Sequence, residues 1–253
     1  MNELSGRCAV VSGATSGIGR MQSIMLAAEG ACVVCVGRDE ARMTEVVDEI
    51  NRAGGTALPC VGSITEEDTA LHAAQAAREA CGRIDILCAT AGVFDAFTPS
   101  HELSAAQWDY YMDTNVKGVF LLTNAVLPDM LAQESGSIII MSSIAGLTGN
   151  SGGAAYTASK HALTGYTKQL CIDYAAKGIR ANAICAGSVL SPILEGIFTQ
   201  FPHEREKVLE TIPAKRIGTT EDIGHLTVFL ASDKAAWING SIISADGGRS
   251  AFG

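Results

Sequence analysis

The chain has 253 residues, of which 47% are hydrophobic and 6% aromatic, and its formal net charge is −9 at pH 7. An acidic chain without a lysine or arginine run is not expected to bind nucleic acid or an anionic membrane. Since no apolar run approaches the roughly 20 residues that span a bilayer, and the start shows no leader pattern, the composition predicts a soluble, cytoplasmic protein.

Short apolar runs alternate with helical patterns along the whole chain. Strands are predicted at 8–13, 31–37, 56–62, 84–92, 136–143, 179–187 and 240–248. Amphipathic stretches lie between them, and a long helical region from Ser104 is expected to break at Pro128. Because the strands are apolar on both faces, this order predicts a Rossmann-like, doubly wound parallel sheet of about seven strands. We expect a single α/β domain over 1–253, with three α/β/α layers.

The eight cysteines lie in apolar stretches. Cys32 and Cys35 form a C-x-x-C pattern, but positions three apart in a strand face opposite sides of the sheet. All eight are therefore expected to be buried thiols of a reducing compartment. His101 and His203 have no partners at metal-ligand spacing, and no metal site is predicted.

A glycine-rich turn, SGATSGIGR at 12–20, follows the first strand. Gly13, Gly17 and Gly19 permit a tight turn and a close approach of the backbone to a ligand. The helix that begins there offers free N–H groups and a positive dipole end to a pyrophosphate. A turn that binds nothing is the alternative, but the position between the first strand and helix favours a dinucleotide site.

The end of the second strand predicts which nucleotide binds. Dinucleotide sites often place an acid there to accept from the ribose hydroxyls, whereas this chain has Gly37 followed by Arg38. An arginine can pair with a 2′-phosphate, and Asp39 is expected to cap the next helix. We therefore predict NADP(H) in preference to NAD(H).

Tyr156 and Lys160 lie four residues apart in a helical run, so they share one face of the helix. This spacing is common and predicts nothing alone. Together with the glycine turn, Asn115 in DTNVKGVF and Ser143 thirteen residues before Tyr156, it makes the chain similar to the short-chain dehydrogenases/reductases of the single-domain type. The resemblance covers essentially all 253 residues.

The resemblance implies an oxidoreductase that interconverts a secondary alcohol and a ketone. Tyr156 would exchange a proton with the substrate oxygen, and Lys160, with the oxidised nicotinamide, would lower its pKa. Ser143 would hydrogen-bond the oxygen, and Asn115 would hold a water that links Lys160 to solvent. A homotetramer is typical of the family. The implied cofactor-binding residues are Gly13, Thr15, Ser16, Gly17, Ile18, Gly19, Gly37, Arg38, Ser63, Ile64, Thr90, Ala91, Gly92, Tyr156, Lys160, Gly187, Val189 and Ser191.

Several positions depart from the family's pattern. The usual Asn-Asn-Ala-Gly after the fourth strand is Ala-Thr-Ala-Gly at 89–92, which weakens the expected support of the central sheet. Ser63 replaces an aspartate near the adenine, Ala186 replaces a proline, and Ser191 replaces a threonine. These changes affect the expected cofactor affinity and loop shape, while the reacting groups are intact.

Substrate choice is expected in the loops, above all at roughly 188–215. Apolar side chains there and at 92–97 suggest a lid over a small hydrophobic molecule such as a hydroxysteroid or bile acid, although a helix packed on its own protein would show the same pattern. The segment IPAKRIGTTEDI resembles 3-oxoacyl-thioester reductases of the acyl-carrier-protein type, which is the alternative substrate class. The alternative outside the enzymes is a non-catalytic redox sensor that only binds a nucleotide. The apolar residues are Phe94, Phe97, Ile193, Leu194, Ile197, Phe198 and Phe201.

Overall fold

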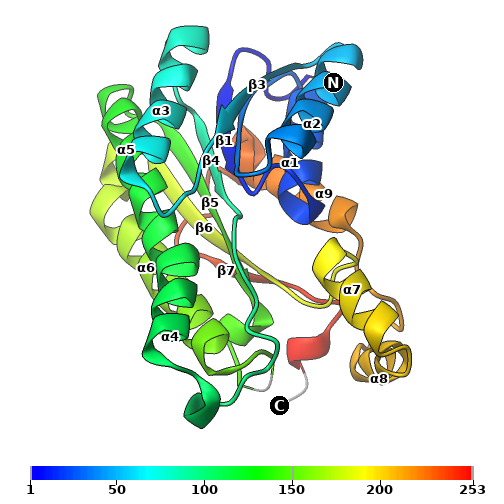
Figure 1. Cartoon of the computed structure of the whole chain (residues 1–253). Helices are drawn as coiled ribbons and strands as arrows, with labels where there is room; N and C mark the ends of the chain where they lie inside the picture. Colours follow the sequence, from blue (N-terminus) through cyan, green and yellow to red (C-terminus); the bar gives the residue numbers. More distant parts are fainter. Residues whose placement is uncertain (1, 150, 252–253) are drawn as a thin grey trace.

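Within the described residues, seven parallel strands form one sheet in the order β3-β2-β1-β4-β5-β6-β7 (Figure 1). The structure is a computed structural model that describes residues 2–149 and 151–251, without the side chain of Ile193. Because the strand order reverses direction between β1 and β4, the predicted doubly wound sheet is confirmed. The strands are β1 (Cys8–Ser12), β2 (Cys32–Gly37), β3 (Thr56–Val61), β4 (Ile86–Ala89), β5 (Gly136–Ser143), β6 (Ile179–Ala186) and β7 (Ile242–Ala245).

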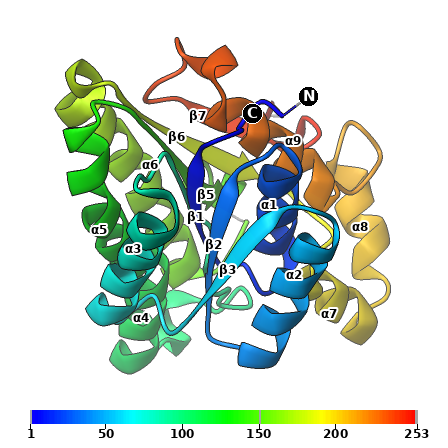
Figure 2. The ribbon, with the colours of Figure 1, turned by 90° about the horizontal axis from the view of Figure 1, so that it is seen from above.

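Helices cover both faces of the sheet (Figure 2). Helices α1, α2 and α9 enclose one hydrophobic core, and α3, α5 and α6 enclose the other. Helices α7 and α8 lie beyond the carboxyl ends of the strands (Figure 1). The helices are α1 (Gly17–Ala28), α2 (Glu40–Arg52), α3 (Glu67–Cys81), α4 (Ala105–Met112), α5 (Gly118–Ala132), α6 (Ala154–Tyr174), α7 (Pro192–Gln200), α8 (Glu204–Thr211) and α9 (Thr220–Ala231). In the part of the chain that is described, no helix is long and apolar enough to cross a membrane.

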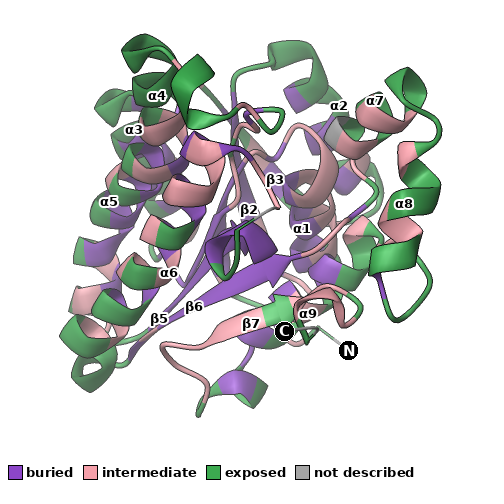
Figure 3. Ribbon diagram, turned by 90° about the horizontal axis from the view of Figure 1, so that it is seen from below, coloured by how far each residue is buried: buried purple, intermediate pink, exposed green. Residues whose placement is uncertain are grey.

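The strands differ in burial according to their place in the sheet. Figure 3 shows β5 and β6 buried, while β7 at the sheet edge is partly exposed. The other edge strand, β3, has both buried and exposed positions and contains Pro59. A proline lacks the N–H that a central strand would need, so it fits an edge strand.

The expected break at Pro128 is wrong, because α5 runs through this residue to Ala132. Pro128 cannot donate to the carbonyl four residues earlier, which belongs to Asn124. Both residues are exposed, so solvent can satisfy that carbonyl. The opposite side of α5 is held by Leu122, Val126 and other buried residues, and this packing keeps the helix intact.

Candidate active site

A cavity of ≈ 470 Å³ lies at the carboxyl ends of the strands, where the strand order reverses between β1 and β4. This is the place at which doubly wound sheets bind ligands, and the volume suits a small molecule. The glycine turn, the segment after β4, the end of β5, the start of α6 and helices α7 and α8 all contribute to it. The predicted residues that line it are Gly13, Ser16, Gly17, Ile18, Gly19, Thr90, Ala91, Gly92, Ser143, Tyr156, Lys160, Gly187, Val189 and Ser191.

The glycine turn has the shape that a pyrophosphate requires. Gly13 and Gly17 have φ values of 69° and 53°, which favour glycine. A Cβ at Gly19 would collide with the carbonyl oxygen of Gly13. The N-cap residue Ser16 makes no side-chain hydrogen bond to the N–H groups of α1, and no acid lies in the first turn. The turn therefore offers backbone donors and a positive helix end to an anionic group.

The expected 2′-phosphate region lies at the end of β2, outside the cavity lining. A Cβ at Gly37 would lie 2.7 Å from Cγ2 of Thr15, so an acidic side chain fits here only if Thr15 moves. Arg38 is exposed. Asp39 caps α2 as predicted, since its Oδ1 accepts from the Arg42 N–H at 3.0 Å. Arg38 is therefore an exposed cation directly after the end of β2.

Two further predicted cofactor residues follow β3, also outside the cavity lining. The hydroxyls of Ser63 and Thr65 form a hydrogen bond of 2.8 Å. Ile64 is buried and packs closely on Gly118: a Cβ added to Gly118 would lie 2.6 Å from Cδ1 of Ile64. Ile64 therefore fixes this loop against the start of α5.

Thr90 compensates for the missing asparagines after β4. The Ser12 hydroxyl accepts from the N–H groups of Thr90 and Ala91 at 3.0 and 3.1 Å. Thr90 Oγ1 donates to Gln22 Oε1 at 2.5 Å, and Gln22 Nε2 donates to Thr227 Oγ1 at 2.9 Å. The segment is thus tied to α1 and α9 through a buried glutamine that the sequence analysis missed, because a glutamine in a helix gives no pattern of its own.

Ser143, Tyr156 and Lys160 meet at the cavity. Ser143 is the last residue of β5, and Tyr156 and Lys160 lie one turn apart near the start of α6. The Lys160 Nζ donates to the carbonyl oxygen of Met141 at 2.9 Å and lies 5.5 Å from the centroid of the Tyr156 ring. The three predicted groups are therefore assembled as expected.

Burial sets the direction of the Tyr156 pKa in the protein alone, before the charge of an oxidised nicotinamide is added. In the protein alone, burial raises the pKa of Tyr156, a hydrogen bond with Ser143 lowers it, and the charge of Asp95 raises it further. Burial also lowers the pKa of Lys160 to about 8, because a backbone carbonyl, and no carboxylate, faces its ammonium group. At neutral pH the tyrosine is consequently a phenol, ready to give a proton rather than to take one.

Asp95 is a site residue that the sequence analysis missed. It is 1% exposed, and its two oxygens accept from the N–H groups of Gly153 and Tyr156, each at 2.8 Å. Gly153 is the N-cap of α6 and has no side chain to cap the helix. A carboxylate from the loop after β4 therefore caps the helix that carries Tyr156 and Lys160.

Asn115 lies behind the cavity, in a π-helical turn (Asp113–Lys117) between α4 and α5. Its amide accepts from the Val93 N–H at 2.8 Å and donates to the Val93 carbonyl and the Ser159 hydroxyl, each at 3.0 Å. The side chain thereby joins the segment after β4 to α6. Turns of this type interrupt helices frequently at functional sites.

The part of the cavity lining that comes from the segment after β4 and from α7 is largely apolar. Phe94 packs edge-on against Tyr156 and Phe97, with ring centroids 5.0 and 5.1 Å apart. Leu194, Ile197 and Phe198 of α7 also line the cavity, which favours the lid over a helix packed only on its own protein. Phe201 is 45% exposed and outside the lining, and the side chain of Ile193 lies outside the described residues.

Charged residues at the rim were not predicted. Lys207 pairs with Glu204 at 2.6 Å, and both line the cavity with Arg249. The Arg249 guanidinium donates to the Ser188 hydroxyl at 3.2 Å. These residues belong to α8 and to the end of the chain. Neither segment directly follows a predicted strand, so the sequence pattern gave no reason to place them at the site.

Comparisons with known proteins assign the family. The family profile described as Enoyl-(Acyl carrier protein) reductase matches residues 13–250. A 3-oxoacyl-[acyl-carrier-protein] reductase of Thermotoga maritima is 34% identical, with 97% of this chain and 98% of the relative covered. The chain belongs to the short-chain dehydrogenase/reductase family. Like other members, it is an oxidoreductase that acts on alcohol and ketone groups with a nicotinamide cofactor.

Solved structures of family members agree with this assignment. A levodione reductase superposes with a TM-score of 0.93 at 31% identity, covering 99% of this chain and 100% of that chain. A protein of Beutenbergia cavernae, assigned as an NAD(P)-dependent gluconate 5-dehydrogenase and containing NADP, gives a TM-score of 0.92 at 35% identity and covers 99% of each chain. The names of these relatives refer to chemically different substrates.

Proposed function

We propose that this family member is an NADP(H)-dependent enzyme that interconverts a hydrophobic secondary alcohol and its ketone. The observation that carries the proposal is the convergence of Ser143, Tyr156 and Lys160 on a cavity that the glycine turn also lines. A cofactor with its pyrophosphate at that turn would extend toward the tyrosine. The intact reacting groups disfavour a non-catalytic nucleotide sensor.

In the proposed reduction, the ketone oxygen lies between the Tyr156 and Ser143 hydroxyls. When bound, the reduced cofactor would supply the hydride to the carbonyl carbon. Tyr156 gives its proton to the oxygen as negative charge develops there, and Ser143 donates a hydrogen bond to the same atom. Lys160 then returns a proton toward the phenolate, with the π-helical turn around Asn115 as the route to solvent. Because burial raises the pKa of Tyr156, the reduction is favoured at neutral pH and the oxidation at higher pH.

The preference for NADP(H) rests on the end of β2. Gly37 leaves no carboxylate for the ribose hydroxyls, and Thr15 occupies the space that a side chain at 37 would need. The exposed Arg38 can pair with a 2′-phosphate. NADP bound to the related Beutenbergia cavernae structure is consistent with this preference.

The apolar wall supports a hydrophobic substrate, such as a hydroxysteroid or bile acid. Phe94, Leu194, Ile197 and Phe198 present apolar surface to the space beside Tyr156. A 3-oxoacyl thioester is the second candidate, because its acyl chain is apolar and a reductase of this kind is a full-length relative. Lys207 and Arg249 at the rim could bind the phosphate of a thioester carrier.

A substrate panel tests the proposal. NADPH consumption would be followed with 3-keto, 7-keto and 17-keto steroids, an acetoacetyl thioester and a small diketone. We expect turnover with a steroid class, and Ile197→Asn should raise KM for that substrate more than it lowers kcat. The exposed Phe201→Asn is the matched control and should change neither constant. Turnover of the thioester alone would favour the second candidate, and a lack of turnover with every steroid and with the thioester would contradict both.

We also propose that four copies of the chain associate through α5 and α6. Phe120 on α5 is 45% exposed, and its ring lies 6.4 Å from that of Tyr166 on α6. Ile172 on α6 is 79% exposed, and exposed apolar side chains on neighbouring helices are typical of an interface. Light scattering should give the mass of a tetramer, and Ile172→Asp should lower it. A monomeric mass for the wild type would refute this.

A further inference from the structure

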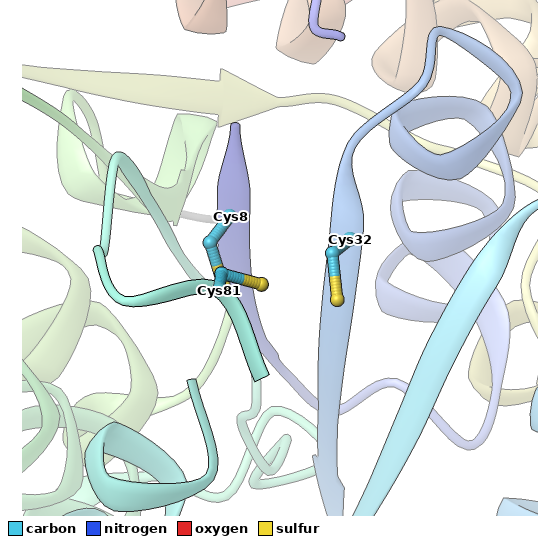
Figure 4. Close-up of side chains that lie close together, drawn as sticks. All are labelled: Cys8, Cys32 and Cys81. Atoms are coloured by element: carbon cyan, nitrogen blue, oxygen red, sulfur yellow. The ribbon is translucent and has the colours of Figure 1, made fainter. Parts of the chain in front are cut away.

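Three cysteine side chains converge at the end of the sheet opposite the cavity. Figure 4 shows Cys8 of β1, Cys32 of β2 and Cys81 of α3 close together. Their Sγ atoms all lie within 4.8 Å of one another. The C-x-x-C pattern is irrelevant to this cluster, because Cys35 packs into the core under α1 and α2, on the other face of the sheet.

The cluster is held by backbone structure rather than by flexible loops. Cys8 and Cys32 are paired residues of adjacent parallel strands, so their side chains share one face of the sheet. Asp85 binds the backbone of Cys8 twice: its N–H donates to the Cys8 carbonyl at 2.9 Å, and its Oδ2 accepts from the Cys8 N–H at 2.8 Å. Cys81 ends α3, and Gly82, with φ 70°, turns the chain directly toward this Asp85.

Solvent can reach two of the three thiols. Cys8 is fully buried, whereas Cys32 and Cys81 are partly exposed, which corrects the expectation that all eight cysteines are buried. Cys171 is also partly exposed.

We propose that Cys8, Cys32 and Cys81 form a binding site for one soft, thiolate-preferring metal ion such as Cu⁺ or Zn²⁺. Metal–sulfur bonds of about 2.3 Å place three ligating sulfurs roughly 3.8 to 4.0 Å apart, so the observed cluster needs only small side-chain rotations. On binding, each ligating thiol that is still protonated gives its proton to solvent, and no oxidation state changes. Thiolates select soft ions over Mg²⁺ or Ca²⁺.

The site is separate from the proposed catalytic machinery. Cys8 begins β1 and Ser12 ends it, so about 13 Å of strand separates the cluster from the glycine turn. An ion here would join β1, β2 and the end of α3. We therefore expect it to stabilise the fold by binding the native state, without a part in the reaction of Tyr156.

Titration of the fully reduced protein with Cd²⁺ tests the proposal. Thiolate-to-metal charge-transfer absorption should rise to a plateau at about one ion per chain, and competition with Zn²⁺ and with Cu⁺ would show which ion the site prefers. Cys32→Ser and Cys81→Ser should each abolish the plateau. Cys171→Ser, at another partly exposed cysteine, should retain it, and Mg²⁺ should not compete.

Folding and catalysis are measured separately from metal binding. The melting temperature of the metal-free variants should stay close to that of the wild type, and Cd²⁺ should raise it only in the wild type and Cys171→Ser. Tyr156→Phe should bind Cd²⁺ like the wild type, which separates this site from the proposed function. Absence of the absorption in the reduced wild type, or an equal plateau in Cys32→Ser and Cys81→Ser, would overturn the proposal.

Discussion

Asp95→Asn is predicted to weaken the fold and to change the pH dependence of the reaction. The buried carboxylate accepts two hydrogen bonds of 2.8 Å from the first turn of α6, and bonds to a charged group contribute about 1.5–3 kcal/mol each. Asparagine keeps one acceptor and turns its NH₂ group toward the other N–H. We expect a loss of about 2–3 kcal/mol, which for a chain of this length lowers Tm by roughly 5–10 °C.

The same substitution also acts on Tyr156. The negative charge of Asp95 raises the pKa of Tyr156, so a neutral residue should lower it. Alcohol oxidation requires the ionised tyrosine as base, and the rise of its rate with pH should therefore shift to lower pH in Asp95→Asn. Urea unfolding gives the stability, and the initial rate of NADP⁺ reduction across pH gives the shift.

A matched variant separates these effects from a general loss of charge. Asp48→Asn removes an exposed carboxylate of α2 that lies outside the cavity lining, and it should change stability by less than about 0.5 kcal/mol. Its pH profile should equal that of the wild type. Unchanged stability of Asp95→Asn would refute the capping role of Asp95. A pH profile that moves to higher pH would refute the effect of its charge on the pKa of Tyr156.

Three other substitutions have defined outcomes. Lys160→Met should abolish turnover yet raise the free energy of unfolding at pH 7 by about 2 kcal/mol. The pKa of Lys160 is lowered from 10.5 to about 8, which means that burying its ammonium group costs about 3 kcal/mol. The variant avoids this cost but loses the hydrogen bond to Met141, which contributes about 1 kcal/mol. The wild type regains stability as the pH rises from about 8 to 10.5, so the difference in stability between Lys160→Met and the wild type in urea unfolding should shrink near pH 10. A variant that is less stable than the wild type at pH 7 would contradict the argument. Arg38→Ala should weaken NADPH binding about tenfold or more and leave NADH binding unchanged, as measured by fluorescence titration; equal effects on both would remove the basis for the NADP(H) preference. Thr90→Val should cost about 1–3 kcal/mol in thermal unfolding, because it leaves the buried Oε1 of Gln22 without this donor, and an unchanged Tm would show that the bond does not stabilise the fold.

The strands and most site residues could be predicted because their signals are local. Apolar runs bounded by glycines identify parallel strands, and the carboxyl ends of such strands meet at one edge of the sheet. This brings Gly13, Ser143 and Tyr156 together although they are far apart in the chain. Asp39 was recognised as a cap because capping residues stand directly before their helix.

The features that were missed depend on tertiary contacts. Asp95 caps a helix that starts 59 residues later at Ala154, and no spacing rule relates the two. The burial that raises the pKa of Tyr156 in the protein alone also depends on tertiary packing. Pro128 is tolerated because the carbonyl it leaves unpaired faces solvent, and the cysteine cluster arises from strand register between Cys8 and Cys32.

The most direct test of the central claim compares the wild type with Tyr156→Phe in NADPH consumption, with NADPH binding measured alongside. Phenylalanine keeps the ring that packs on Phe94 and removes only the hydroxyl. If Tyr156 is the proton donor, turnover of the preferred ketone should fall by about 100-fold or more while NADPH still binds. Turnover that persists in Tyr156→Phe at the wild-type rate would contradict the proposed mechanism.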